Sequence, residues 1–189
     1  MTVKAAKGFL VGSTAVLLLG IGFIACANYI QAKAWLAQYL IEQAWQQSVE
    51  TNSQVKPWPW ADTFVVGELQ LPQQNLMILE GESLRNLAFG PTRMSSSAKF
   101  EQFGNTVIYG HRDTHFASLE EVKLGDRIQV KHKNGVRNYV INSIEVVNAF
   151  DSYVTAPSQD TMLTLITCYP FGGIEVNPDQ RFVVKALAI

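Results

Sequence analysis

One cysteine is the first candidate for chemistry in this chain. The 189 residues include two cysteines, of which Cys26 lies in a long apolar segment near the N-terminus. Cys168 follows the apolar run Leu163–Thr167 and precedes a proline-containing turn, so we expect it at the end of a strand, where a side chain can face a cleft. Such a thiol is either buried and inert or a reactive nucleophile, and both interpretations stay open at this point.

Three histidines are available to activate that thiol. A thiol with a pKa of about 8.5 is mostly protonated at neutral pH, and it becomes an effective nucleophile beside an imidazole or a guanidinium. His111 and His115 follow the strand-like run Val107–Tyr109, whereas His132 lies beside the hairpin signal Asn134–Gly135. We expect His132 to be a solvated turn residue, so a cysteine–histidine site requires His111 or His115 close to the thiol.

The spacing of His111 and His115 also raises the question of a metal site. Histidines four residues apart on a helix can bind one zinc ion. Gly110 and Asp113 favour a loop here instead of a helix, and no third ligand presents itself in the sequence. We therefore expect neither a metal ion nor another cofactor.

Three further polar residues are candidates for a supporting role. Arg181 opens the last strand-like run, where it is either an ordinary strand-edge charge or a donor to an oxyanion or a substrate carbonyl. Asp113 is two residues from His111, so it either orients the imidazole or caps a turn, and we favour the turn. Thr167 should face away from its neighbour Cys168 in a regular strand, which indicates a structural position.

Composition narrows the classes of protein to which this chain can belong. The net charge is −1, from 15 basic and 16 acidic residues, which excludes nucleic-acid binding through bulk charge. Two cysteines are too few for a disulfide scaffold or a structural zinc site. Only 16% of the residues are charged, against about 25% in a usual soluble domain. The deficit is uneven along the chain and points to a membrane segment.

The segment 9–27 has the properties of a transmembrane helix. Its 19 residues, FLVGSTAVLLLGIGFIACA, carry no charge, and at about 1.5 Å per residue they nearly cross a hydrocarbon core of about 30 Å. Lys4 and Lys7 precede it, so the positive-inside rule keeps residues 1–8 in the cytoplasm and places the remainder outside a single-pass cytoplasmic (inner) membrane anchor. A cleaved signal peptide and a lipoprotein attached through Cys26 are the alternatives.

The segment 28–50 predicts a juxtamembrane helix, because it is rich in Ala, Gln, Glu and Leu. We favour an interfacial aromatic belt over packing of its apolar stripe on the next domain. Pro57 and Pro59 prevent the helix from continuing, so residues 51–60 are expected to be a linker. The remaining 129 residues, 61–189, are enough for one domain with a single core.

That domain is predicted to be mainly β, with short helices. Its strand-like runs are rich in Val, Ile, Thr, Phe and Tyr and are separated by turn signals, which favours a barrel or a sandwich. The predicted strands are Thr63–Leu71, Leu76–Leu79, Asn105–Tyr109, Asp126–Lys131, Val136–Val147, Met162–Thr167 and Gln180–Leu187. Short helices are expected at Glu82–Ala88 and Ser118–Val122, and a loop is expected at residues 93–100.

The candidate residues together resemble a known family. Thr164–Cys168 reads TLITC and matches the TLxTC motif of sortases, which are cysteine transpeptidases. Gly110–Asp113 matches their catalytic-histidine segment, and Arg181 matches their late-strand arginine, in the same chain order. The stretches KPWPWAD, LAFGPT, GHRDTHF and TLITCYPF resemble the sortases of Gram-negative, often marine, bacteria and are similar to class D sortases of Gram-positive bacteria.

The resemblance implies a closed sortase β-barrel of about eight strands in residues 61–189. Cys168 would attack an LPxTG-like C-terminal sorting signal of a protein substrate, and an amine of peptidoglycan or of a protein lysine would resolve the thioacyl-enzyme. His111 would act as general acid and then as general base, and Arg181 would hold the oxyanion or the peptide backbone. His115 lies in the matching segment and would have a supporting role, as would Asp113 and Thr167.

Two other functions compete with a transpeptidase. One is a hydrolytic cysteine peptidase, although papain-like enzymes place the cysteine before the histidine and this chain has the reverse order. The other is a non-catalytic periplasmic β-domain in which Cys168 is structural. The sequence does not decide between water and an amine as the second nucleophile.

Overall fold

The computed structural model describes residues 3–175 and 178–189 and divides into two compact units, the residues up to Tyr39 and Leu40–Ile189. One helix, α1, runs without a break from Val3 to Thr51, where two adjoining helices were predicted. Among the described residues, α1 is the one helix that is long and apolar enough to cross a membrane. The helix ends at Thr51, six residues before Pro57, as the prolines of the predicted linker require.

The last turns of α1 belong to the second unit and pack on its strands. Ile41 and Trp45 are buried against Val65 and Leu79, with Trp58 and Phe89 packed beside them in an edge-to-face pair. This end of the helix therefore buries an apolar stripe, the less favoured of the two expectations.

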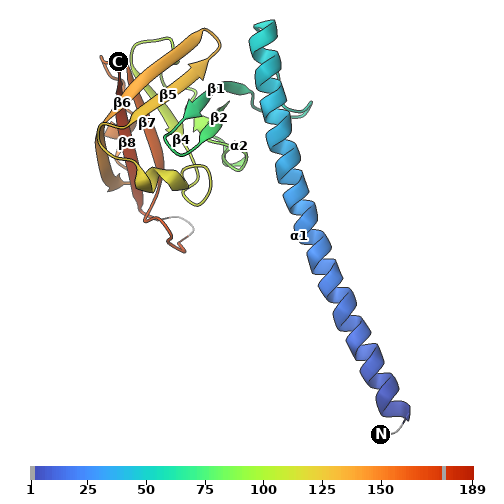
Figure 1. The fold of residues 1–189 in the computed structure, drawn as a ribbon. Helices are drawn as coiled ribbons and strands as arrows, with labels where there is room; N and C mark the ends of the chain where they lie inside the picture. Colours follow the sequence, from blue (N-terminus) through green and yellow to red (C-terminus); the bar gives the residue numbers. More distant parts are fainter. Residues whose placement is uncertain (1–2, 176–177) are drawn as a thin grey trace. The chain divides into compact units, whose positions relative to one another are not determined.

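The second unit contains a closed eight-stranded barrel, which confirms the predicted fold class (Figure 1). Around the barrel the strands follow the order β1-β2-β3-β4-β7-β8-β6-β5. Their bounds are β1 Val65–Gln70, β2 Asn75–Glu80, β3 Thr92–Arg93, β4 Asn105–Tyr109, β5 Arg127–His132, β6 Gly135–Asn148, β7 Met162–Tyr169 and β8 Gln180–Ala188. Three short helices complete it: α2 Leu84–Leu87, η1 Ala117–Glu121 and η2 Ser152–Thr155.

Strand β3 is the one strand that the sequence pattern did not indicate, and it corrects the start of the loop predicted at 93–100. Thr92 and Arg93 pair in parallel with β2 and antiparallel with β4, and so link the two strands. Two residues are too few to show an alternating pattern, so only the pairing partners identify the strand.

Side chains alternate between the barrel interior and its outer face. The interior is filled by large apolar residues that include Leu69, Ile108, Phe116, Leu165 and Val184. A second, smaller cluster covers the outer face of β4, β7 and β8. Its members are Val107, Val147, Val154, Ile166 and Val183, with Met94 and Tyr109 packed against them.

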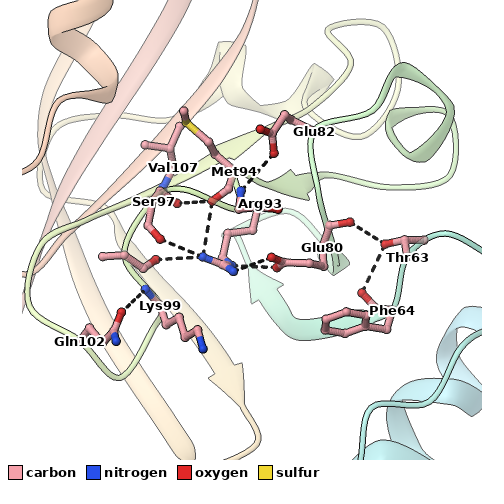
Figure 2. A network of polar contacts seen from close by, with 12 residues as sticks. Thr63, Phe64, Glu80, Glu82, Arg93, Met94, Ser97, Lys99, Gln102 and Val107 are labelled. Atoms are coloured by element: carbon pink, nitrogen blue, oxygen red, sulfur yellow. Dashed lines mark hydrogen bonds and ion pairs between the residues drawn. The ribbon is translucent and has the colours of Figure 1, made fainter.

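A buried arginine holds the segment between β3 and β4. The guanidinium of Arg93 forms two hydrogen bonds with the Glu80 carboxylate, at 3.0 and 2.7 Å, and donates to the carbonyl oxygens of Met94, Ser97 and Ala98 (Figure 2). This fork of donors satisfies several backbone acceptors of an irregular segment at once.

His132 corrects the prediction of a solvated turn residue. It ends β5, and its side chain is only 7% exposed. The ring stacks on Phe100, and Nδ1 lies 3.4 Å from a carboxylate oxygen of Glu101. The hairpin turn begins directly after it, so proximity to Asn134 and Gly135 in sequence did not mean exposure.

Replacing Ile41 tests the packing of α1 on the barrel. Ile41 is 1% exposed, so Ile41→Ala should lower the free energy of unfolding by about 2–5 kcal/mol through lost burial and a residual cavity. The thermal unfolding midpoint of the full chain in detergent, followed by tryptophan fluorescence, measures the effect. Leu36→Ala, at a position that is 56% exposed, is the matched control and should change the midpoint little. Equal midpoints for both variants would contradict the packing.

Candidate active site

Strand pairing brings Cys168 and Arg181 side by side. In the antiparallel ladder of β7 and β8, Cys168 lies directly opposite Arg181. Side chains of directly opposed residues project from the same face of a sheet, with Cβ atoms about 4.5–5.5 Å apart. The two residues predicted as nucleophile and guanidinium are therefore neighbours, although 12 residues separate them in the sequence.

Strand β4 delivers His111 to the same end of the barrel. Tyr109 is paired with Ile166 in the parallel β4–β7 ladder. Beyond the strand, the Gly110 amide donates to the Ile166 carbonyl at 3.1 Å, and the Thr167 hydroxyl donates to the Gly110 carbonyl at 2.8 Å. The next residue on one strand is His111 and the next on the other is Cys168. Thr167 is buried and turned to the other face from Cys168, as predicted, and its hydroxyl ties the two strand ends together.

Gly110 is required at this point because no side chain fits there. A Cβ atom on Gly110 would lie 2.5 Å from the ring of Phe116, which is fully buried in the barrel core. The Phe116 amide donates to the His111 carbonyl at 2.9 Å, so the segment after His111 folds back over that ring. The ring therefore anchors the histidine segment to the barrel.

Cys168 lies on the outer face of the barrel beside the smaller apolar cluster. Ile166 and Val183, on the same faces of β7 and β8, are buried in that cluster. Cys168 itself is a free, half-buried thiol, and His111 is exposed. The thiol is thus accessible at the edge of an apolar surface, which argues against a purely buried structural cysteine.

The connection between β6 and β7 borders this surface and is held in place by polar contacts. Tyr153 of η2 donates to Glu145 at 3.0 Å, and Lys185 lies 2.6 Å from the other oxygen of that carboxylate. The hydrogen bond from Lys185 is the main reason why the pKa of Glu145 is lowered. Val154, the next residue in η2, packs into the apolar cluster. These contacts order the connection beside the candidate site.

Arg181 is half-buried and oriented by backbone carbonyl groups. Its Nη1 donates to the carbonyl oxygens of Pro178 at 2.6 Å and Gln180 at 2.9 Å. Burial raises the pKa of Tyr109, and the charge of Glu82 adds to this rise. The positive charge of Arg181 opposes it, so Arg181 and Tyr109 interact electrostatically. Among the residues that the structure describes, Nε and Nη2 of Arg181 have no hydrogen-bond acceptor.

His115 lies close to His111 and is half-buried. Burial is the main cause of its lowered pKa, and the charge of His111 adds to the effect. Its Nδ1 is 3.3 Å from the Thr114 hydroxyl, and its backbone carbonyl accepts a hydrogen bond from Gln74 at 2.8 Å. The surroundings therefore favour the neutral imidazole.

Asp113 does not form either of the contacts expected of it. Its carboxylate accepts a hydrogen bond from Nε of Arg112 at 3.1 Å, whereas a contact with His111 or a cap on the following turn was expected. Arg112 is buried and donates to three carbonyl groups in the segment after β7. Sequence reasoning missed Arg112, and the only signal available was its place between the histidine and the aspartate.

The described residues contain no group of three or more His, Cys, Asp or Glu side chains that could hold a metal ion. His111 and His115 lie in a turn segment outside any helix.

Acidification should reveal the environment of His115. Its pKa in the folded chain lies below the ordinary value of 6.5, so the unfolded chain takes up the proton first as the pH falls. The resulting loss of stability is absent above about pH 6.5 and develops below it. His115→Gln, which stays neutral, should lose less stability between about pH 7.5 and pH 5.5. Urea unfolding of both proteins at the two pH values measures this, and equal losses would contradict it.

Comparison with known proteins identifies the family. The model of the Sortase domain matches residues 69–189. Sortase D of Bacillus subtilis (strain 168) is 31% identical over 121 residues, which are 62% of this chain and 61% of that protein. This chain thus spans about three fifths of the length of that relative.

Solved structures agree with the barrel described above. A Clostridium perfringens Sortase D5 transpeptidase superposes with a TM-score of 0.66 at 20% identity, covering 82% of this chain and 98% of that one. Sortase A of Listeria monocytogenes superposes with a TM-score of 0.59 at 26% identity, covering 66% of this chain and 87% of that one. Because the family model matches well over half of its residues, this chain belongs to the sortase family and is similar to class D sortases.

Proposed function

We propose that this chain is a membrane-anchored cysteine transpeptidase that cleaves an LPxTG-like C-terminal sorting signal and transfers the acyl group to an amine. The observation that carries the proposal is the pairing of Cys168 with Arg181 across β7 and β8, beside the strand end that leads to His111. Membership of the sortase family supports the same chemistry. Each residue's role follows from its functional group and its position.

The first half of the reaction forms a thioester. The Cys168 thiol gives its proton to His111, its sulfur attacks the carbonyl carbon of the scissile peptide bond, and the carbonyl oxygen takes up negative charge. Arg181 stabilises that oxyanion or holds the peptide backbone with Nε and Nη2, while its Nη1 is oriented by Pro178 and Gln180. The C–N bond then breaks as His111 gives a proton to the leaving amine, which leaves a thioacyl-enzyme on Cys168.

The second half of the reaction transfers the acyl group. His111, now a base, removes a proton from the incoming amine, which attacks the thioester carbonyl. The C–S bond breaks, the thiolate takes that proton back from His111, and a new amide links the two partners. The amine is that of a peptidoglycan peptide or of a protein lysine, so the products are proteins attached at the cell envelope.

The supporting residues affect the position and charge of the proposed catalytic groups. Thr167 joins the strand ends that carry Cys168 and His111. His115 remains neutral beside His111, so it adds no second positive charge when His111 is protonated. Asp113 supports the site through its hydrogen bond with Arg112, and not through a contact with the His111 imidazole.

The N-terminal helix is proposed to anchor the enzyme. Residues 9–27 lie within α1 and match a signal-anchor in length and composition. With Lys4 and Lys7 on the cytoplasmic side, the barrel lies outside the cytoplasmic membrane, where sorting signals and envelope amines are available.

Trapping the thioacyl-enzyme tests the proposed reaction. The full chain in detergent is incubated with a library of LPxTG-like peptides, with and without hydroxylamine or diaminopimelate, and adducts are followed by intact mass spectrometry. We expect an adduct on Cys168 that is lost in Cys168→Ala, is retained in the matched control Cys26→Ser, and is discharged preferentially by the amine. Hydrolysis alone despite excess amine would favour a peptidase. An unreactive thiol and no adduct with any peptide would favour the structural cysteine.

Thiol labelling tests the proposed orientation. In right-side-out membrane vesicles, a membrane-impermeant maleimide should label Cys168 of the Cys26→Ser variant, because the barrel lies outside and the thiol is half-buried, not enclosed. Inside-out vesicles should require permeabilisation for the same labelling. Labelling in inside-out vesicles only would reverse the proposed topology.

A further inference from the structure

Arg112 joins the two segments that carry the proposed catalytic residues. It directly follows His111 in the chain and is only 6% exposed. Its guanidinium reaches the segment that directly follows β7, so it bridges the histidine segment and the continuation of the cysteine strand. The two reaction steps described above use no group of this buried side chain.

Arg112 makes four hydrogen bonds, and three of them go to backbone carbonyl groups beyond Cys168. Nη1 donates to Pro170 at 3.0 Å, and Nη2 donates to Gly173 at 2.6 Å and to Glu175 at 3.0 Å. The fourth runs from Nε to Asp113 at 3.1 Å. A guanidinium has five N–H groups in a rigid planar fork, so one side chain can hold several acceptors in a fixed arrangement.

The segment that Arg112 contacts is anchored at its start by Phe171, which packs against the barrel core and the ring of Phe182. The segment lies between β7 and β8, contains Gly172 at φ +67°, and has exposed residues at Gly172, Ile174 and Glu175. Within the part of this segment that the structure describes, the Gly173 amide donates to the Pro170 carbonyl at 3.4 Å. The guanidinium packs closely enough that a Cβ atom on Gly173 would lie 3.3 Å from Nη1. Arg112 therefore adds three hydrogen bonds to the part of this turn that the structure describes.

Burial of a charged guanidinium costs free energy unless its donors are satisfied. Here three carbonyl oxygens and the Asp113 carboxylate accept from four of the five N–H donors. The Asp113 carboxylate, at 63% side-chain exposure, also provides the opposite charge from the solvent side. Asp113 thus has a physical reason to lie beside the histidine without touching it, because it neutralises and orients Arg112.

We infer that Arg112 is a positioning residue that sets the place of His111 relative to Cys168 by clamping the β7–β8 connection to the histidine segment. The inference rests on the proposed function, since it concerns the geometry of that thiol and imidazole. Misplacement of reacting groups by about 1 Å can reduce a rate roughly 10²-fold. Loss of the clamp should therefore lower kcat much more than it raises KM.

The test compares Arg112→Gln and Arg112→Lys with a second buried arginine. Arg93→Gln is the matched control, because Arg93 is also buried and makes five hydrogen bonds, all of them to Glu80 and to the carbonyl groups of residues 94–98 (Figure 2). Its removal reports the effect of losing a buried guanidinium whose hydrogen bonds reach neither the histidine segment nor the segment after β7. His111→Ala is the reference for a thiol without its imidazole. All variants are full-length chains in detergent.

Two measurements follow each variant, in addition to kcat with a peptide found in the trapping experiment. The first is the rate of Cys168 alkylation by iodoacetamide across pH, in a Cys26→Ser background. The second is amide hydrogen exchange at Gly173. We expect Arg112→Gln to give the alkylation profile of His111→Ala, faster exchange at Gly173 and a kcat roughly 10²-fold lower. Arg112→Lys should recover only part of the wild-type kcat and of the protection at Gly173, because one ammonium group cannot reach three carbonyl groups. Arg93→Gln should keep the wild-type profile even if the barrel is less stable.

The outcomes separate this inference from the proposed function. If Arg112→Gln keeps the wild-type alkylation profile and the wild-type exchange rate at Gly173, the positioning role is wrong, whatever happens to stability. If Arg93→Gln changes the profile as much as Arg112→Gln does, the effect is general destabilisation and the inference fails. If wild type and His111→Ala have the same profile, the imidazole does not act on the thiol, and the proposed function fails with it.

Discussion

The parallel pairing of β4 with β7 is the contact on which the site depends. Parallel neighbours cannot be joined by a tight turn, so the chain must travel through β5, β6 and two short helices before it returns as β7. This connection contains the strands that close the barrel, and it places the ends of β4 and β7 together. Every candidate group is then carried by one of these two strand ends or by β8, which pairs antiparallel with β7.

Irregular segments of the barrel domain are ordered by side chains that reach backbone carbonyl groups. Arg93 does this for the segment after β3, and Arg112 does it for the segment after β7. Tyr153, Glu145 and Lys185 fix the connection before β7 through side-chain contacts. Since loops cannot bury much apolar area, such multivalent donors give them a defined conformation without a metal ion or a disulfide. The barrel provides the rigid base to which these contacts are attached.

Much of the fold could be predicted because its strands are long and alternate in polarity. Seven of the eight strands were expected within a few residues of their bounds, and Cys168 was expected at a strand end. Strand β3 was missed because two residues carry no periodicity. His132 was misjudged because its burial comes from Phe100 and Glu101, which are distant in sequence. A local sequence pattern indicates the strand to which a residue belongs. It does not indicate which distant side chains pack on that residue.

For the site, the sequence by itself determined which functional groups are available: one thiol in the barrel domain, the imidazoles of the histidine segment, and an arginine at the start of the last strand. Their chain order and motifs were sufficient to indicate the sortase family. Only the tertiary structure decided that Cys168 is opposite Arg181, that Asp113 pairs with Arg112, and that Arg112 reaches the β7–β8 connection. The physical reason is that strand register and loop contacts depend on partners up to 63 residues apart in the chain, and no local propensity encodes those distances.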